Sequence, residues 1–460
     1  MKAAIKIIIC LSFISLACTL VPAQVLEGAE KEFESAVNQY TENYQNLQSS
    51  RGLPSIPLQK IPEAGQTESQ QEAAESFLLR GAAPLSVKYA RSSSLSGFTQ
   101  ALRNNFASGT ALIFYAYQDG SLQIWLIGQE GLQAYSSRAM TQQKLESVIY
   151  DLRNSLGVDS LQANRAPSLR NPNGATADVR LKKSTDSAIA DVTDVLLPSP
   201  IAERLSSVRH LIVAPILGIG TVPFAILRPF KSDAFLIEKM SVSVVPNLFD
   251  IEDNTKAWTP RYRNPLVVGN PYFPPDANWK VPPLPGAEEE ALAIAKMINA
   301  RPLIRRRATK RRVMARAANA DFLYFATHGI ASSDDPLTGG FLFLTDRSLT
   351  KGFWTAKEIQ SSRLTAQLAV LSACQTGLGK IHDAGVIGLS RAFQIAGVPR
   401  VVMSLWSVND KATAELMKSF VKYLRSNVPS EALRLAMLEV KRDRPQLSQW
   451  ASFVLFGTPR

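Results

Sequence analysis

Leu368 to Gly377 read LAVLSACQTG, and this stretch decides how the second half of the chain folds. A run of apolar and small residues leads into a cysteine, which is followed by a polar bend that ends in glycine. A continuous apolar run of this length is typical of a strand that is buried on both faces of a sheet. Cys374 is therefore expected at the carboxyl end of a buried strand, where binding and catalytic sites collect in such sheets.

The sequence around this stretch alternates strands with helices from residue 264 to the end. The expected strands lie in PLVVGNPYF, RPLIRR, DFLYFAT, AQLAVLSA and VPRVVMSLWSV. The expected helices are GAEEEALAIAKMINA, ATKRRVMARAANA with Thr309 as N-cap, and residues 385–396, 410–426 and 430–442. This alternation predicts an α/β fold with a mostly parallel sheet and helices on both faces over residues 264–460.

The residues before 264 differ from this alternating pattern of strands and helices. Within residues 24–83, an amphipathic helix is expected over 25–50 and a linker rich in Pro, Gln, Glu and Ser over 51–83. Residues 84–263 are β-rich and helical: GTALIFYAYQDGSLQIWLIG predicts a hairpin that turns at Asp119-Gly120, a helix is expected from Thr141 to Leu156, and HLIVAPI and SVSVVPN are short strands.

The first 23 residues, MKAAIKIIICLSFISLACTLVPA, have the pattern of a signal peptide. Lys2 and Lys6 precede a short apolar core, and cleavage is expected after Ala23, which predicts export to the periplasm or the exterior. Lipoprotein processing at Cys18 is the alternative, although Ser15 stands where a Leu-like residue is expected. No apolar run after residue 24 is long enough to span a membrane.

Composition indicates an ordinary globular protein without a cofactor. The net charge of +12 comes from scattered basic residues and one dense cluster at 305–312, which is either a solvated surface or a site for an anionic partner; nucleic acid is not expected. No Cys/His cluster supports a metal site, and no cofactor is expected. The chain has three cysteines, of which Cys374 alone follows the signal segment, as a reactive thiol or an inert core residue.

A histidine follows the strand that precedes LAVLSACQTG. The segment FATHG places His328 at the carboxyl end of that strand. A thiol acts as a nucleophile when an imidazole lies beside it, and the N–H groups of Gly329 and Cys374 could together form an oxyanion hole. The alternative is two unconnected strand ends. His382 falls in a polar loop with no strand to fix it, and His210 opens a strand at an expected sheet edge.

Several segments together resemble the CHAT domain, a bacterial branch of the caspase–separase group of cysteine peptidases. They are FLYFATHG, LAVLSACQTGLG, RAFQIAGVPRVVMSLWSVND and WASFVLFGTP, with HLIVAP, VPFAIL, FLIEK, VVPN and LPGAEEEA upstream. The resemblance implies a caspase-like fold, with 84–263 as the N-terminal part of the CHAT region and 264–460 as the catalytic domain. It implies a catalytic dyad of His328 and Cys374. After QTGLG the sequence reads KIHDAGVIGL, which departs from the family's usual Gly-Glu-Gly pattern.

The resemblance also implies an endopeptidase that acts on protein or peptide substrates, with a regulatory protein partner as a further possibility. An extended substrate would pair along the segment VVMSLWSV, which contains Trp406. Members of the group often prefer a basic residue before the cut, for which Asp410 and then Asp383 are the candidate carboxylates. A first-turn acid of helix 410–426 is the alternative for Asp410. The alternative function is a scaffold or peptide-binding module whose dyad is present but unused.

Overall fold

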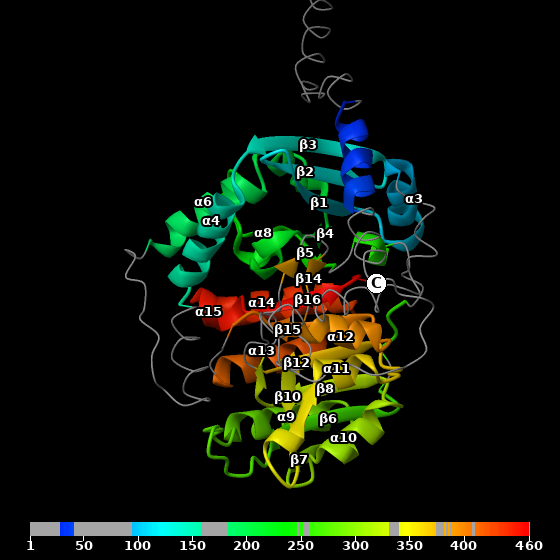
Figure 1. Cartoon of the computed structure of the whole chain (residues 1–460), viewed down its shortest axis with the longest axis vertical. Helices are drawn as coiled ribbons and strands as arrows, with labels where there is room; N and C mark the ends of the chain where they lie inside the picture. Colours follow the sequence, from blue (N-terminus) through cyan, green and yellow to red (C-terminus); the bar gives the residue numbers. More distant parts are fainter. Residues whose placement is uncertain are drawn as a thin grey trace, which may run out of the picture.

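The computed structural model of the 460-residue chain describes residues 28–40, 94–157, 183–245, 248–251, 257–260, 262–330, 340–373, 381–382, 385–386, 388–406 and 410–459. Its main feature is an eleven-stranded sheet that runs along the longest axis of the molecule (Figure 1). The strand order is β3-β2-β1-β4-β5-β16-β15-β12-β8-β6-β7. The expected signal peptide and the expected linker at 51–83 lie outside the described residues.

The second half of the chain forms the parallel part of this sheet. Its strands are β6 (Pro265–Pro271), β7 (Leu303–Arg305), β8 (Phe322–Ala326), β12 (Leu368–Ser372) and β15 (Arg400–Ser404), each parallel to its neighbours in this set. Apart from the edge strand β7, these strands are buried along almost their whole length. The predicted parallel sheet is therefore confirmed, and its continuous apolar runs follow from burial on both faces.

Helices cover both faces of this half, as predicted. On one face lie α9 (Pro285–Met297), α13 (Asp410–Tyr423) and α14 (Pro429–Asp443), and on the other α10 (Lys310–Ala317), α11 (Ala356–Gln360) and α12 (Leu389–Ile395) (Figure 1). Helix α10 has the expected cap, since the Thr309 side chain accepts a hydrogen bond from the N–H of Arg312. The helix expected over 385–396 is shorter: Gly385 belongs to β14 (Gly385–Val386), and α12 begins only after Gly388, because glycine disfavours a helix interior.

The first half adds an antiparallel ribbon and two parallel strands. β1 (Thr110–Gln118) and β2 (Ser121–Gly128) form the predicted hairpin, with positive φ at Asp119 (48°) and Gly120 (73°). Further elements are β3 (Gly131–Ala139), α4 (Gln142–Ser155), α6 (Thr185–Leu196), α7 (Ser199–Ala202), β4 (His210–Ala214), α8 (Leu236–Lys239) and β5 (Ser241–Val244). Helix α4 has Thr141 as its N-cap, so the predicted helix is confirmed.

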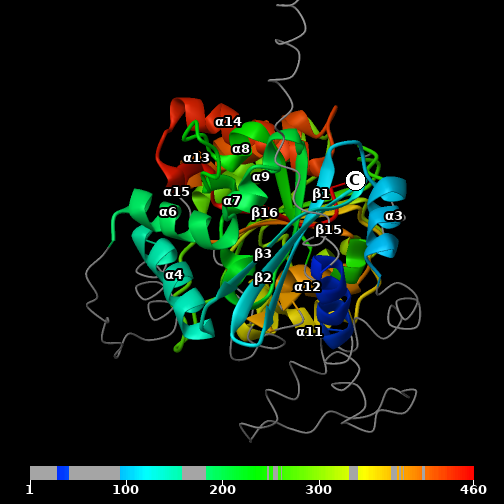
Figure 2. The ribbon, with the colours of Figure 1, turned by 90° about the horizontal axis from the view of Figure 1, so that it is seen from above.

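The N-terminal helix packs on this ribbon. Residues 28–40 are helical and lie beside α3 (Leu95–Asn105) over one face of β1 to β3 (Figure 2). The buried ring of Phe33 makes edge-to-face contacts with Phe98, Phe114 and Trp125, at centroid distances of 5.7 to 5.8 Å. The amphipathic helix is thus confirmed for residues 28–40, and its apolar stripe is explained by this second core.

The two halves share the sheet through a strand that the sequence pattern did not predict. β16 (Phe453–Gly457) is antiparallel to β15 and also pairs with β5. The expected boundary at residue 264 therefore divides a chain whose two parts contribute to a single sheet. A salt bridge also joins them, from Arg391 of α12 to Asp250 of η4 (Leu248–Ile251), at 3.2 Å.

Two histidines differ from their expected surroundings. His210 does not lie at a sheet edge, because β4 is an interior strand between β1 and β5. Its Nδ1 is 2.8 Å from Ser241 Oγ, its Nε2 is 3.0 Å from Ser243 Oγ, and burial lowers its pKa to about 3. His382 does not lie in a loop but in β13 (Ile381–His382), which pairs antiparallel with β14, with His382 opposite Gly385.

Candidate active site

The centre of the candidate site is the shared end of β8 and β12. These strands are parallel neighbours, and Ala326 lies opposite Ser372. His328 follows Ala326 by two residues, and Cys374 follows Ser372 by the same interval in the sequence. Cys374 lies outside the described residues. The sheet therefore brings the strand that leads into Cys374 beside the strand that carries His328.

His328 is held by a backbone carbonyl and by aromatic rings. Its Nε2 is 2.9 Å from the carbonyl oxygen of Pro282. Because a carbonyl can only accept, Nε2 carries the proton, and the lone pair of a neutral imidazole is then on Nδ1. The ring contacts Phe273 and Phe343, at centroid distances of 5.2 and 5.8 Å. This half-buried imidazole thus has a fixed orientation and tautomer, with Nδ1 as its basic atom.

The N–H of Gly329 is directed away from its strand partner. β9 (Gly329–Ile330), β10 (Phe341–Phe343) and β11 (Phe353–Thr355) form a small antiparallel sheet in which Gly329 lies opposite Leu342. The N–H of Phe343 donates to the carbonyl of His328 at 2.9 Å, so His328 and Phe343 form a hydrogen-bonded pair, and the next pair, Gly329 and Leu342, is a non-bonded one. Hydrogen-bonded and non-bonded pairs alternate in antiparallel sheets, which turns the N–H of Gly329 outward from β10. Such an N–H can serve an oxyanion.

A buried serine fixes the end of β12. Ser404 Oγ, at the end of β15, donates to the carbonyl of Ala373 at 2.7 Å, and both residues are buried. Ala373 directly precedes Cys374 in the sequence. Ser404 was not predicted from the sequence, although a polar residue in the apolar run VVMSLW is a signal that points to it. This hydrogen bond orients the backbone that leads into Cys374.

A buried acid and phenol lie under the sheet between α9 and β8. Tyr324 Oη donates to Glu290 Oε1 at 2.7 Å, and both side chains are almost fully buried. Burial, followed by the nearby Glu290 carboxylate, raises the pKa of Tyr324 well above its usual value. This pair was not predicted from the sequence, because Glu290 belongs to a run of acidic residues that is typical of an exposed first helical turn. It links α9 to the strand that carries His328.

The structure places the remaining predicted site residues differently. Trp406 follows β15 and is 2% exposed, with its ring in the main core. A role in substrate binding would therefore fall to the backbone of this segment. Asp410 is the first residue of α13, as in the alternative interpretation of this acid, and Asp383 lies outside the described residues.

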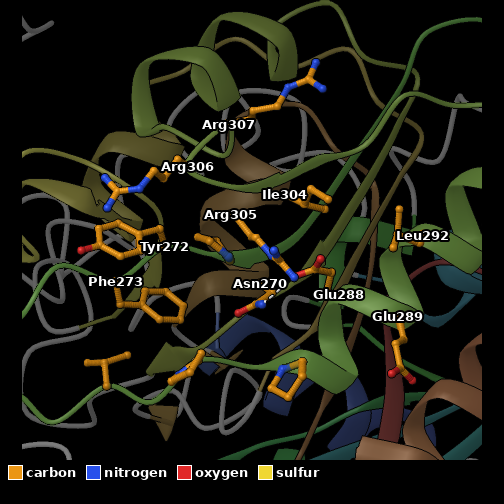
Figure 3. Close-up of a pocket in the computed structure, with 14 residues that line it drawn as sticks. Asn270, Tyr272, Phe273, Glu288, Glu289, Leu292, Ile304, Arg305, Arg306 and Arg307 are labelled. Carbon is orange, nitrogen blue, oxygen red and sulfur yellow. Dashed lines mark hydrogen bonds and ion pairs between the residues drawn. The ribbon is translucent and has the colours of Figure 1, made fainter.

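A cavity of about 910 Å³ lies at the carboxyl ends of β6 and β7, beside the start of α9 (Figure 3). Its wall includes Phe273, whose ring contacts His328, and Pro283, which follows Pro282, the residue whose carbonyl accepts the hydrogen bond from His328. The other lining comes from the carboxyl ends of β6 and β7, from the start of α9 and from Arg305 to Arg307. Part of the basic cluster therefore faces this cavity.

Two kinds of feature are absent from the described part of the chain. No three or more His, Cys, Asp and Glu side chains in it come together as a metal site. None of its helices has the length and apolar character needed to cross a membrane.

Comparison with known proteins places this site in a family. Residues 187–458, which include β4 to β16 and His328, match the family model of the CHAT domain. The chain belongs to the CHAT-domain family. Human and mouse tetratricopeptide repeat protein 28 are similar to this CHAT-domain protein, with 28% identity over 295 residues and 29% over 282 residues. The matches cover 54% and 52% of the chain but only 12% of either relative.

Solved structures give a weaker likeness to the CHAT-domain chain. Two structures of the Saccharomyces cerevisiae separase–securin complex match with TM-scores of 0.47 and 0.46 at 12% identity, and they cover 92% and 93% of the chain. The matched parts are 37% and 36% of the solved chains. A complex of the pro- and mature domains of Porphyromonas gingivalis RgpB matches with a TM-score of 0.39 at 11% identity, over 69% of this chain and 76% of the solved one.

Proposed function

We propose that this CHAT-domain protein is a cysteine endopeptidase that uses His328 and Cys374 as its catalytic dyad. The observation that supports this most strongly is the pairing of Ala326 with Ser372, because both dyad residues follow these partners by the same two-residue interval. The bond from His328 to the Pro282 carbonyl adds a second argument, since it leaves Nδ1 as the base. Members of this family resemble caspase-like peptidases, which rely on such a dyad.

The proposed reaction is acyl transfer through a thioester. The Cys374 sulfur attacks the carbonyl carbon of the scissile peptide bond while its proton passes to His328 Nδ1. The carbonyl oxygen becomes an oxyanion, which the N–H groups of Gly329 and Cys374 stabilise. Collapse of this intermediate breaks the C–N bond, and the leaving amine takes the proton from His328. Water then attacks the thioester with His328 as its base, which releases the carboxylic acid and restores the thiol.

The substrate is proposed to be an extended segment of a protein. It would pair with the backbone that continues from β15 past Trp406, which follows the buried end of that strand. The residue before the cut would be basic and would meet the carboxylate of Asp410 or Asp383. A separate regulatory protein would control access to the site.

We further propose that the protein is exported and that its mature chain begins at Gln24. Sequencing the amino terminus of a recovered, tagged chain tests this. Lipid on Cys18 would favour the lipoprotein alternative.

The alternative is a scaffold or peptide-binding module. The sequence KIHDAGVIGL favours it, since this segment after Cys374 departs from the family's usual Gly-Glu-Gly pattern. Both functions share the fold, so a test must detect bond cleavage rather than binding. The assay is a search for new protein amino termini after incubation of an extract with the wild-type chain or with Cys374→Ala. We expect new termini with the wild type alone; the same set with both proteins, or none with either, would contradict the peptidase function.

A further inference from the structure

Hydrogen bonds hold together the walls of the cavity at the carboxyl ends of β6 and β7. Asn270, near the end of β6, and Arg305, the last residue of β7, both have positive φ, 41° and 47°. Asn270 Oδ1 accepts from the N–H of Leu284 at 2.8 Å, and its Nδ2 donates to Glu288 Oε2 at 2.9 Å. The same carboxylate oxygen accepts from Arg305 Nε at 2.8 Å. These contacts hold the two strand ends and the start of α9 together around the cavity.

The position of the cavity relates it to one side of the reaction. The strand order β12-β8-β6-β7 places it beyond His328, on the side away from the strand that leads into Cys374. Phe273 connects the two, because it lines the cavity and contacts the imidazole ring. In the proposed reaction the thiol keeps the part of the substrate before the cut, and His328 protonates the leaving amine. The segment after the cut therefore leaves on the side of this cavity.

The end of the cavity near His328 is aromatic and positively charged. The Arg306 guanidinium lies 3.9 Å from the centre of the Tyr272 ring, and no described carboxylate forms an ion pair with it. Figure 3 shows Arg306, Tyr272 and Phe273 along one side, whereas the acid Glu289 lies at the opposite side. Glu288 is already paired with Arg305. The stacked Arg306 is thus a preorganised cation with no ion-pair partner among the described residues.

We propose that this cavity binds the substrate segment that follows the cut and that Arg306 selects an acidic side chain in it. This inference rests on the proposed peptidase function. A guanidinium binds carboxylates with two parallel hydrogen bonds, and the Tyr272 ring reduces the conformational freedom that Arg306 loses on binding. The apolar part of the segment packs against Phe273 and Tyr272. The substrates are accordingly proteins with Asp or Glu shortly after the cut.

The test uses a peptide library and a charge-reversed variant. The wild-type chain, Arg306→Glu and the control Arg312→Glu are incubated with the library, and cleaved sites are read by mass spectrometry. Arg312 is an exposed residue in the first turn of α10, where a glutamate is favourable, so its variant makes the same charge change outside the cavity. We expect wild type and Arg312→Glu to prefer Asp or Glu over Asn or Gln after the cut by about threefold to tenfold, and Arg306→Glu to prefer Lys or Arg.

A binding arm separates this inference from the peptidase function. Short peptides with a free amino terminus and either Glu or Gln, which mimic the leaving fragment, are titrated into the same three proteins. Tighter binding of the Glu peptide that is lost in Arg306→Glu supports the cavity's role, even if no peptide is cleaved and the peptidase function fails. The inference is overturned if the protein cleaves without preferring Asp or Glu after the cut, or if wild type binds the Glu and Gln peptides equally. Neither result contradicts catalysis by His328 and Cys374.

Discussion

Ala326 and Ser372 lie opposite each other at the carboxyl ends of the parallel strands β8 and β12. In a parallel pair, equal steps beyond two opposed residues reach the same level of the sheet edge. His328 and Cys374 are each two steps beyond this pair in the sequence. Strand register, rather than sequence proximity, therefore places the strand before His328 beside the strand that leads into Cys374, as the proposed dyad requires.

Loss of the Ser404 hydroxyl should slow the reaction without preventing substrate binding. Ser404→Ala removes the hydrogen bond to the Ala373 carbonyl and leaves a buried acceptor with one partner fewer, at a cost of about 1 kcal/mol in unfolding free energy. The backbone before Cys374 is then held less firmly, so kcat should fall about tenfold while KM changes little. Ser361→Ala, which removes an exposed hydroxyl bond within α11, is the control. An unchanged kcat, or an increase confined to KM, would show that Ser404 does not position the nucleophile.

His210 should make the protein less stable in mild acid. Its folded-state pKa of about 3 lies below the ordinary value of 6.5, so the unfolded chain binds the proton more readily. The stabilisation is complete above pH 6.5 and is lost as the pH falls toward 3, on the order of 2 kcal/mol by pH 5. Chemical denaturation at pH 7 and pH 5 measures this loss. His210→Gln should lose less stability over the same interval; an equal loss would assign the effect to other groups.

The Arg391–Asp250 ion pair should contribute strongly to the attachment of the two halves. The Arg391 side chain is 5% exposed and the Asp250 side chain 17%. Asp250→Ala leaves a buried guanidinium without this partner and should lower the unfolding free energy by about 3 kcal/mol, with part of this recovered in Asp250→Ala/Arg391→Met. The exposed pair of Arg442 and Asp443 provides a control, since Asp443→Ala should have little effect. Equal losses in the two single variants would contradict the prediction.

The candidate carboxylates for a basic substrate residue can be separated by kinetics. If Asp410 forms the pocket, Asp410→Asn should reduce turnover of Arg and Lys substrates about tenfold or more relative to Leu substrates. If it acts in the first turn of α13, where the structure places it, the variant should lose about 0.3 to 1 kcal/mol of stability and keep the preference. Asp383→Asn is measured in parallel. An Arg-to-Leu ratio that is unchanged in both variants would discard the basic pocket.

The elements that the sequence predicted well are those with strong local signals. A few neighbouring residues are enough to predict each of them, as in the Asp119-Gly120 turn, the Thr309 cap and the apolar runs of β8 and β12. β16 was missed because its partners, β15 and β5, lie far from it in the sequence and differ in direction. A short apolar segment near the end of the chain does not reveal which strands it will join.

The site was predictable where side chains define it and not where the backbone does. His328 could be placed at a strand end from the segment FATHG, but the carbonyl that orients it belongs to Pro282, 46 residues earlier in a proline-rich loop. A backbone carbonyl leaves no residue signature. His210 was misplaced for a different reason: the serine side chains that enclose it, Ser241 and Ser243, are supplied by the neighbouring strand β5, and the sequence does not show which strands are neighbours.

The most direct test of the central claim is the rate at which a peptide-like, thiol-directed electrophile labels Cys374. The wild-type chain, His328→Ala and Cys374→Ala are compared by intact mass, with circular dichroism to confirm that each is folded and with the unfolded wild type as the reference for an unassisted thiol. We predict that Cys374 of the folded wild type is labelled at least about 100-fold faster than Cys374 of the unfolded chain, that His328→Ala loses this acceleration, and that Cys374→Ala is not labelled there. Labelling of Cys374 at the same rate in wild type and His328→Ala would show that the two residues do not form a dyad.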